Sequence, residues 1–225
     1  MLRAIVFDFD GVILDSVDVK ARAFRELFRD HGEWVDRIVQ FHLDNPGMSR
    51  FDKFRFIYQT YLGRSLEDGE SDALGQAFSR LVYQEILACP FIRGAPEFLE
   101  RRRKEYAMFV ASAAPDVEVR DIVACRGLAG FFRGVYGSPR AKPDLLRQIL
   151  VDQGLAPWQA VFIGDAVADQ RAAQAVGMPF IAVASKDGQQ RFTEPGVLLA
   201  IENLRELDER WEEVTARVAP GGRAT

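Results

Sequence analysis

The chain has 225 residues, of which 48% are hydrophobic and 28% are charged, a composition typical of one globular domain or of one domain with an insert. This balance excludes the disordered and fibrous classes of protein. The formal net charge of −4 gives no general attraction to nucleic acid or to anionic membranes, so neither is expected as a partner, and a phosphate-bearing ligand needs local basic groups or a metal.

Cysteine content and hydropathy favour a reducing cytoplasm. Cys89 and Cys125 are too few for a disulfide framework and form no Cys-x-x-Cys pair, so we expect two buried free thiols. The chain opens on a strand pattern, and no run approaches the ~18 apolar residues that span a bilayer. We therefore expect a cytoplasmic protein that neither enters nor binds a membrane.

The first predicted strand, residues 2–9, carries acids at its end. Asp8 and Asp10 lie two positions apart and so share one face of an extended strand. Two carboxylates placed in this way repel each other unless a cation or a proton lies between them. The alternative interpretation is a β-hairpin, because Asp10-Gly11 between apolar runs is a strong hairpin signal.

Residues 17–92 contain apolar residues at helical spacing and no strand pattern, which predicts an inserted helical domain. The expected helices cover residues 17–31, residues 49–63 with Ser49 as the N-cap, and about residues 71–88.

After residue 92, strand and helix patterns alternate. A helix that carries Phe98 and Leu99 comes first. The predicted strands cover residues 106–112, 134–138, 161–163 and 180–184. One helix is predicted between residues 112 and 134, and the others cover residues 143–154, 166–176 and 204–218; a frayed tail is expected at residues 220–222. This alternation predicts an α/β fold whose parallel sheet is built from residues 1–16 and 93–225.

Two further acids follow the strand predicted at residues 161–163, namely Asp165 and Asp169. Because the carboxyl ends of parallel strands meet at one edge of the sheet, we expect these acids to lie close to Asp8 and Asp10. Carboxylate oxygens are the ligands that Mg²⁺ prefers, and no His or Cys cluster suits zinc. His31 and His42 stand alone, so we expect them on the surface or at helix ends.

Four short motifs occur in the order and spacing of a known family. They are Asp8-Phe9-Asp10-Gly11-Val12, Ser112 at a strand end, Lys142-Pro143, and the stretch from Gly164 to Asp169. Together they closely resemble the haloacid dehalogenase superfamily, in the phosphoglycolate phosphatase and β-phosphoglucomutase-like branch. The resemblance implies a Rossmann-like parallel core, residues 1–16 and 93–225, and a helical cap of the C1 type, residues 17–92.

The resemblance implies roles for the four acids. Asp8 is the expected nucleophile and forms an aspartyl-phosphate. Asp10 protonates the leaving oxygen and then takes a proton from water, which requires it to be protonated at first. Mg²⁺ is held by Asp8, the backbone carbonyl of Asp10 and Asp165, with Asp169 supporting the metal indirectly.

The remaining core motifs are expected to bind the phosphoryl group. Lys142 contributes a positive charge, and the Ser112 hydroxyl and the Ala113 backbone N–H bind oxygens. Each motif also has a structural alternative: Ser112 as a helix cap, Lys142 as a solvated residue beside a helix start, and Asp165 as an N-cap.

The segment Gly47-Met48-Ser49-Arg50 resembles the loop with which β-phosphoglucomutase-like enzymes hold a second phosphate. Arg50 is therefore a candidate specificity residue, and Lys53, one turn later, adds charge beside it. The alternative is a Ser49 and Asp52 capping box in which Arg50, Lys53 and Arg55 form the solvated face of a helix.

Lys20 occupies the place where mutases of that branch carry a histidine, and this departure favours simple hydrolysis. The sequence thus predicts a magnesium-dependent phosphatase that acts on a small phosphorylated metabolite and works as a monomer or homodimer. The alternatives are a phosphosugar mutase and a noncatalytic binding protein with the same fold. True haloacid dehalogenases need no second aspartate such as Asp10, which favours phosphorus chemistry.

Overall fold

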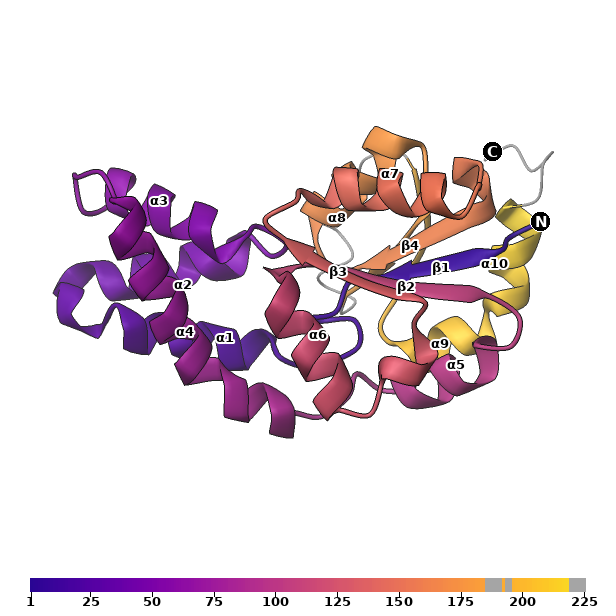
Figure 1. Cartoon of the computed structure of the whole chain (residues 1–225), viewed down its shortest axis with the longest axis horizontal. Helices are drawn as coiled ribbons and strands as arrows, with labels where there is room; N and C mark the ends of the chain where they lie inside the picture. The colour runs from indigo at the N-terminus through magenta and orange to yellow at the C-terminus, as the bar shows by residue number, and fades with distance from the viewer. Residues whose placement is uncertain (185–191, 193–195, 219–225) are drawn as a thin grey trace.

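A six-stranded sheet forms the centre of the protein, in the order β3-β2-β1-β4-β5-β6 (Figure 1). The structure, a computed structural model, describes residues 1–184, 192 and 196–218. The strands are β1 (Ala4–Phe7), β2 (Ala107–Pro115), β3 (Gly134–Ser138), β4 (Ala160–Gly164), β5 (Phe180–Val183) and β6 (Val197–Ile201). Every neighbouring pair is parallel. Strand β6 was not predicted from the sequence.

Strand β1 is buried on both faces, as its unbroken apolar sequence requires. Ile5 and Phe7 pack into one core, whereas Ala4 and Val6 pack into the other. Because both neighbours of β1 run parallel to it, the hairpin interpretation is wrong. The chain instead turns back in a tight loop after Phe9, whose carbonyl accepts hydrogen bonds from two later backbone N–H groups.

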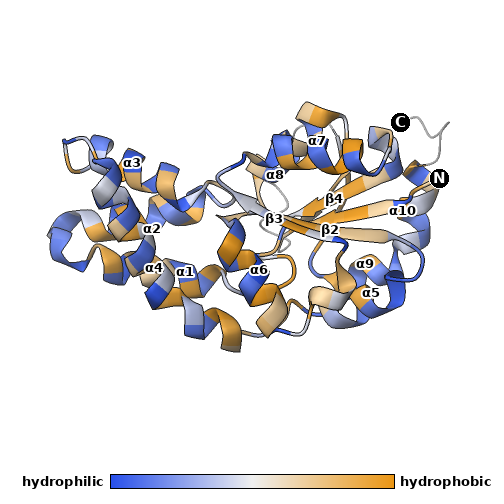
Figure 2. Ribbon diagram, in the orientation of Figure 1, coloured by the Kyte–Doolittle hydropathy of each residue, from blue (hydrophilic) through white to orange (hydrophobic). Residues whose placement is uncertain are grey.

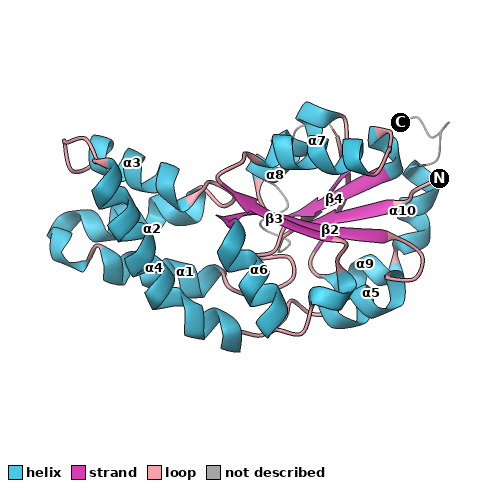
Figure 3. Cartoon of the chain, in the orientation of Figure 1, coloured by secondary structure: helices cyan, strands magenta, loops and turns pink. Residues whose placement is uncertain are grey.

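Helices cover both faces of the sheet (Figures 1 and 3). On one face lie α7 (Lys142–Asp152) and α8 (Val167–Val176). On the other face lie α5 (Ala95–Arg102), α6 (Asp116–Cys125), α9 (Leu204–Glu209) and α10 (Trp211–Val218). Figure 2 shows mostly hydrophobic strands between these layers, while hydrophilic and hydrophobic residues alternate along the helices.

Four more helices pack together beyond the end of the sheet that lies opposite the N-terminus (Figure 1). They are α1 (Val17–Leu27), α2 (Val35–Asp44), α3 (Arg50–Thr60) and α4 (Asp68–Ala88). Buried aromatic rings hold them together: the ring centroid of Phe24 lies 5.8 Å from that of Phe54 and 5.1 Å from that of Phe78. The predicted fold, a Rossmann-like core with an inserted helical cap, is confirmed.

Several element boundaries differ from the predictions. The helix predicted for residues 17–31 ends at Leu27, and a short 3-10 segment, Arg29–Trp34, kinks at Gly32, whose φ is +49°. Helix α2 was not predicted. The helix predicted for residues 204–218 is broken at Arg210 into α9 and α10. The predicted tail, residues 220–222, lies outside the described residues.

The expectation of two buried thiols is half wrong. Cys89 is buried, but Cys125 is exposed because it lies in the last turn of α6 and is not among the residues that this helix buries. Both cysteines are free. In the described part of the chain, no helix is both long enough and apolar enough to cross a membrane.

Candidate active site

Acidic side chains from two neighbouring strands meet at the carboxyl edge of the sheet. Strand β1 ends beside β4, with Phe7 paired to Ile163, so Asp8 and Asp165 emerge side by side. The backbone N–H of Asp8 donates to the carbonyl of Ile163 at 2.8 Å. Carboxylate oxygens of Asp8, Asp165 and Asp169 all lie within 4.8 Å of one another. The predicted convergence of these three acids is present in the structure.

Two glycines permit this close approach. Gly11 has a φ of +75°, and a Cβ atom at this position would lie 2.3 Å from Oδ2 of Asp165. A Cβ atom at Gly164 would lie 2.5 Å from Cβ of Asp169. Since real side chains do not approach so closely, both positions need glycine if the acids are to gather.

Lys142 connects two of the acids. It is the first residue of α7, and its Nζ lies 2.6 Å from Oδ2 of Asp8 and 2.5 Å from Oδ1 of Asp169. Burial disfavours the ammonium, but the charges of Asp169 and Asp8 outweigh that effect and raise the pKa of Lys142 above its ordinary value. Lys142 is buried, so the alternative of a solvated lysine is wrong.

The acids carry more negative charge than Lys142 neutralises. Burial raises the pKa of Asp8 well above its ordinary value, Lys142 opposes the rise, and the charges of Asp169, Asp165 and Asp10 add to it. Burial, followed by the charge of Asp169, raises the pKa of Asp165 to about 7. Such a site is suited to a cation with oxygen ligands.

Asp169 also fixes the start of α8. The backbone N–H of Ala166 donates a hydrogen bond to Oδ2 of Asp169 at 3.2 Å. The other oxygen, Oδ1, accepts a hydrogen bond from the Lys142 ammonium. The N-cap residue of α8 is Ala166, so the alternative role of Asp165 as the N-cap is wrong. Asp165 is instead partly exposed toward the cavity described below.

Asp10 is held as a carboxylate. Lys20 on α1 forms an ion pair with Oδ2 of Asp10, and the hydroxyl of Ser16 donates to Oδ1 at 2.6 Å. Burial favours the neutral acid, but Lys20 and Ser16 outweigh burial and lower the pKa of Asp10. The partner lysine thus stabilises the ionised form of Asp10, whereas the acid role expected of this residue begins from the protonated form.

Ser112 and Ala113 lie near the end of β2, which extends to Pro115. The Ser112 hydroxyl is buried and accepts a hydrogen bond from the N–H of Ala114 at 3.1 Å. Helix α6 begins at Asp116 with Pro115 as its N-cap, so Ser112 does not cap that helix. Ala113 lines the same cavity as Asp8.

The cap residue Arg50 contacts the core rather than solvent. Its side chain lies over the ring of Phe78 at 4.7 Å and forms a two-pronged ion pair with Glu118 of α6, at 2.6 Å and 3.1 Å. Nη1 of Arg50 also donates to Ser79 at 2.7 Å. The side chain is therefore not on a solvated face, and Glu118 already occupies the guanidinium fork that was expected to bind a ligand.

The Ser49 cap is confirmed, because its hydroxyl accepts the N–H of Asp52 at 3.2 Å. Arg55 is exposed. It is the one residue that fits the alternative interpretation, in which Arg50, Lys53 and Arg55 form a solvated helix face. Lys53 differs from it, with only 3% of its surface exposed. Nζ of Lys53 lies 2.9 Å from Nδ1 of His42 and 3.2 Å from the carbonyl oxygen of His42.

His42 was expected on the surface or at a helix end, and the expectation of a surface position is wrong. It is buried, and its ring stacks on Phe24 with centroids 4.2 Å apart. The signal that was missed is helical periodicity, because His42 follows the fully buried Ile38 by one turn of α2. His31 is half-buried beside Phe28.

Gly47 forms part of the boundary between cap and core. Its φ is +78°, and a Cβ atom there would lie 3.1 Å from Cβ of Ala166 and 3.2 Å from Cβ of Ala168. The cap loop therefore rests directly on the start of α8, beside the acids.

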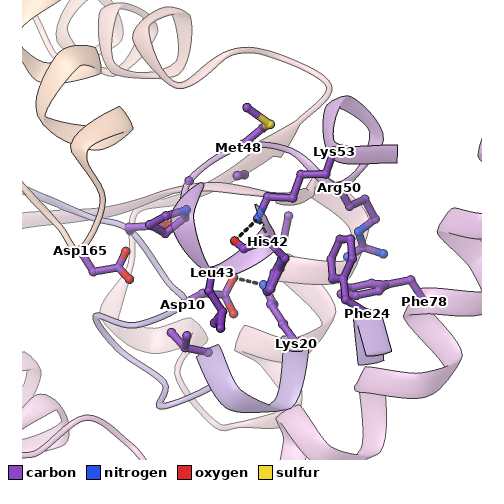
Figure 4. A pocket seen from close by; sticks show the side chains of 16 residues that line it. Asp10, Lys20, Phe24, His42, Leu43, Met48, Arg50, Lys53, Phe78 and Asp165 are labelled. Atoms are coloured by element: carbon purple, nitrogen blue, oxygen red, sulfur yellow. Dashed lines mark hydrogen bonds and ion pairs between the residues drawn. The ribbon is translucent and has the colours of Figure 1, made fainter. Parts of the chain in front are cut away.

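A cavity of about 80 Å³ lies between the cap and the core (Figure 4). The predicted site residues that line it are Asp8, Asp10, Lys20, Gly47, Arg50, Lys53, Ala113 and Asp165. Lys142 lines a second, larger cavity of about 610 Å³ that shares Gly47 and Ala113 with the first. Ser112 and Asp169 are buried behind these surfaces. The structure thus brings every predicted site residue to one region.

The parallel sheet of this order, with acids following β1 and β4 and a buried lysine at the start of α7, forms a Rossmann-like core with a charged site beneath a helical cap. The chain belongs to the haloacid dehalogenase-like hydrolase family, whose model matches residues 5–183.

Two curated relatives and one solved structure illustrate the similarity. The chain is 26% identical to a 5'-nucleotidase of Pseudomonas aeruginosa, over 80% of this chain and 81% of the relative. It is also 26% identical to a phosphoglycolate phosphatase of Pseudomonas savastanoi pv. phaseolicola, over 91% of this chain and 78% of the relative. The structure of a β-phosphoglucomutase from Clostridium difficile aligns with a TM-score of 0.78 at 16% identity, covering 98% of this chain and 100% of that one. This last similarity shows a shared fold.

The glycine constraint at position 11 gives a testable prediction. Gly11→Ala and Gly63→Ala both place a side chain at positive φ, but only Gly11 faces Asp165, whereas Gly63 faces open space. We expect Gly63→Ala to cost roughly 1–2 kcal/mol of unfolding free energy and Gly11→Ala to cost a further ~1–3 kcal/mol from overpacking. Urea unfolding measures both values, and equal costs would contradict the close packing of Gly11 against Asp165.

Proposed function

We propose that this protein is a magnesium-dependent phosphatase that hydrolyses a small phosphate ester through a phosphorylated Asp8. The observation that carries the proposal is the contact of Lys142 with both Asp8 and Asp169, beside Asp165. This arrangement offers a carboxylate nucleophile, a positive charge for the phosphoryl oxygens and ligands for a metal. The relatives named 5'-nucleotidase and phosphoglycolate phosphatase support phosphate esters as substrates.

The donor set fits Mg²⁺. Three carboxylates lie within 4.8 Å of one another and Lys142 supplies one compensating charge, so negative charge remains in a buried site. We propose that Asp8, Asp165 and the backbone carbonyl of Asp10 hold the metal, with Asp169 orienting the site through Lys142. Bound Mg²⁺ supplies positive charge that reduces the repulsion between the nucleophile and an anionic substrate.

Asp8 is positioned for attack on phosphorus. Its Oδ1 accepts a hydrogen bond from the backbone N–H of Phe9 at 2.7 Å, and its Oδ2 accepts one from the Lys142 ammonium at 2.6 Å. These contacts fix the orientation of the carboxylate, and the charge of Lys142 opposes the burial that raises the pKa of Asp8. A bond from Asp8 to phosphorus forms as the bond to the ester oxygen breaks, and water then releases phosphate from Asp8. Ser112 and the Ala113 N–H are the proposed partners of the phosphoryl oxygens.

Asp10 and Lys20 form the proposed proton-handling pair. In this conformation Asp10 is ionised, which suits the removal of a proton from the attacking water. The leaving oxygen needs a proton in the earlier step. Because the Lys20 ammonium contacts Asp10 directly, we propose that Lys20 supplies this proton by way of Asp10, and that the proton which Asp10 later takes from water restores the Lys20 ammonium.

The geometry favours hydrolysis over the alternatives. A phosphosugar mutase needs a group that holds a second phosphate, but the fork of Arg50 is occupied by Glu118. A noncatalytic protein has no need to retain buried acids whose burial and mutual repulsion raise the pKa of Asp8 and Asp165. We propose that residues 17–92 act as a cap over the site and that the enzyme works in the cytoplasm as a monomer or homodimer.

Replacement of the nucleophile tests the mechanism. We expect Asp8→Asn to lower kcat on phosphate esters by roughly 10³-fold or more, because an amide does not form the phosphorylated intermediate. Asp18→Asn, an exposed position on α1, serves as the control and is expected to retain activity. The rate of phosphate release is measured for both variants with millimolar Mg²⁺. Comparable turnover by the Asp8 and Asp18 variants would exclude this mechanism.

The pKa of Asp165 predicts how metal binding depends on pH. Its folded pKa is raised to about 7, so the metal-free folded state retains a proton that the unfolded state has lost. The stability due to this proton is present below the unfolded pKa and is lost as pH rises toward 7. Mg²⁺ needs the ionised acid, so we expect it to raise Tm more at about pH 8 than at about pH 5.5.

Thermal unfolding with and without Mg²⁺ measures the rise in Tm at each of the two pH values. Asp165→Asn is expected to lose most of the Mg²⁺-dependent rise in Tm because it removes a proposed ligand. A rise that is the same at both pH values, or that Asp165→Asn retains, would show that Mg²⁺ binds elsewhere.

A further inference from the structure

Basic residues gather at the edge of the sheet that lies opposite the candidate active site. Arg3 precedes β1, Lys104 lies shortly before β2, and Arg133 precedes β3. Because these three strands are adjacent and parallel, their amino ends meet at one edge. In Figure 1 the N-terminus marks this edge, and helices α1 to α4 lie beyond the opposite one. The three residues, together with Arg103, line a cavity of about 330 Å³.

Backbone hydrogen bonds hold the segments that carry these cations side by side. The carbonyl oxygen of Arg3 accepts a hydrogen bond from the N–H of Ala107 at 3.0 Å. The N–H of Arg133 donates to the carbonyl oxygen of Met108 at 2.8 Å. The register of the sheet therefore brings the cations together, although they are far apart in the sequence.

Three of the four cations have no carboxylate partner. Arg3, Lys104 and Arg133 are exposed and form no ion pair with any residue in the described ranges, whereas Arg103 pairs with Glu100 at 2.9 Å. The whole chain has 33 acidic residues against 29 basic ones, so a local excess of positive charge runs against its composition. Like charges gathered in one pocket repel each other, and an anion between them relieves the repulsion.

The other polar groups of the pocket add donors more than acceptors. The hydroxyl of Tyr106 accepts the indole N–H of Trp211 at 3.2 Å, so its own proton is available to donate. Gln153 adds a side-chain amide. Among the described residues that line the pocket, Glu105 is the one carboxylate, and it lies 3.9 Å from Nη1 of Arg102. The lining is thus suited to an anion with several acceptor oxygens.

We propose that this pocket binds a small anion that carries two or more phosphate groups, either free pyrophosphate or the polyphosphate of a nucleotide. The guanidinium groups of Arg3 and Arg133 match the geometry of phosphate oxygens, and three cations balance more charge than a single phosphate or carboxylate carries. A cavity of about 330 Å³ is of the size that holds a small molecule. The proposal does not depend on the proposed phosphatase function, because the two sites lie at opposite ends of β1 and β2.

Calorimetric titration of the full chain tests this proposal. The probes are inorganic phosphate, pyrophosphate and ADP, without Mg²⁺ so that turnover does not interfere. We expect pyrophosphate to bind at least about tenfold more tightly than phosphate, and Arg3→Ser combined with Arg133→Ser to weaken pyrophosphate binding at least about tenfold. Because the cations are exposed, the affinity is expected to fall as NaCl is added.

The comparison of ADP with pyrophosphate distinguishes the two sources of the ligand. Tighter binding of ADP assigns the pocket to a nucleotide, because the nucleoside then adds contacts of its own. Equal or weaker binding of ADP assigns it to free pyrophosphate. Either result supports the proposal, provided that Arg3→Ser with Arg133→Ser removes the binding.

A matched control separates the pocket from the charge of the protein as a whole. Arg80→Ser combined with Arg93→Ser removes the same charge from two exposed positions elsewhere, and we expect it to change pyrophosphate affinity less than about twofold. Since neither Arg3 nor Arg133 lies in the last turn of an α-helix, we expect their replacement to leave Tm unchanged or to raise it. A lower Tm with unchanged pyrophosphate binding would show that these cations serve only the fold.

Other results would also overturn the proposal. They are the absence of pyrophosphate binding, binding that survives Arg3→Ser with Arg133→Ser, and an equal loss of affinity in the control variant. A single-stranded RNA oligonucleotide and vesicles of anionic lipid are tested alongside. Binding of either one by a protein that does not bind pyrophosphate would assign the basic edge to a macromolecule or a membrane surface instead.

Discussion

The mutual repulsion of buried carboxylates is the constraint on which the rest of this structure depends. Asp8 and Asp165 follow adjacent parallel strands, and Asp169 joins them from the first turn of α8. Lys142 bonds to two of the three and compensates part of their charge. The remaining negative charge is the basis of the proposal that a divalent cation binds at this edge of the sheet and that the phosphoryl group binds beside it.

The cap completes this electrostatic arrangement from the other side. It brings Lys20 to Asp10 and places the Lys53 ammonium in the same cavity. The ion pair between Arg50 and Glu118 joins the cap to α6. In the proposed mechanism the core carries out phosphoryl transfer, while the cap contributes the basic groups Lys20, Arg50 and Lys53 to the wall of the cavity.

The sequence predicted the fold and the acidic side of the site because both depend on local patterns. Apolar runs that end in acids identify Asp8 and Asp165, and alternation of strands and helices implies that the strand ends meet. The sequence did not predict β6 or the burial of His42. It also did not predict the partner of Arg50, because Glu118 lies 68 positions away in the sequence and no local pattern links two such distant side chains.

The most direct test of this account is chemical trapping of the intermediate. After rapid mixing with a labelled phosphate ester and Mg²⁺, acid quenching within one turnover preserves a phosphorylated carboxylate for peptide analysis. The account predicts label on the peptide that contains Asp8, and no label in Asp8→Asn protein. Release of phosphate without any label on Asp8 would contradict it.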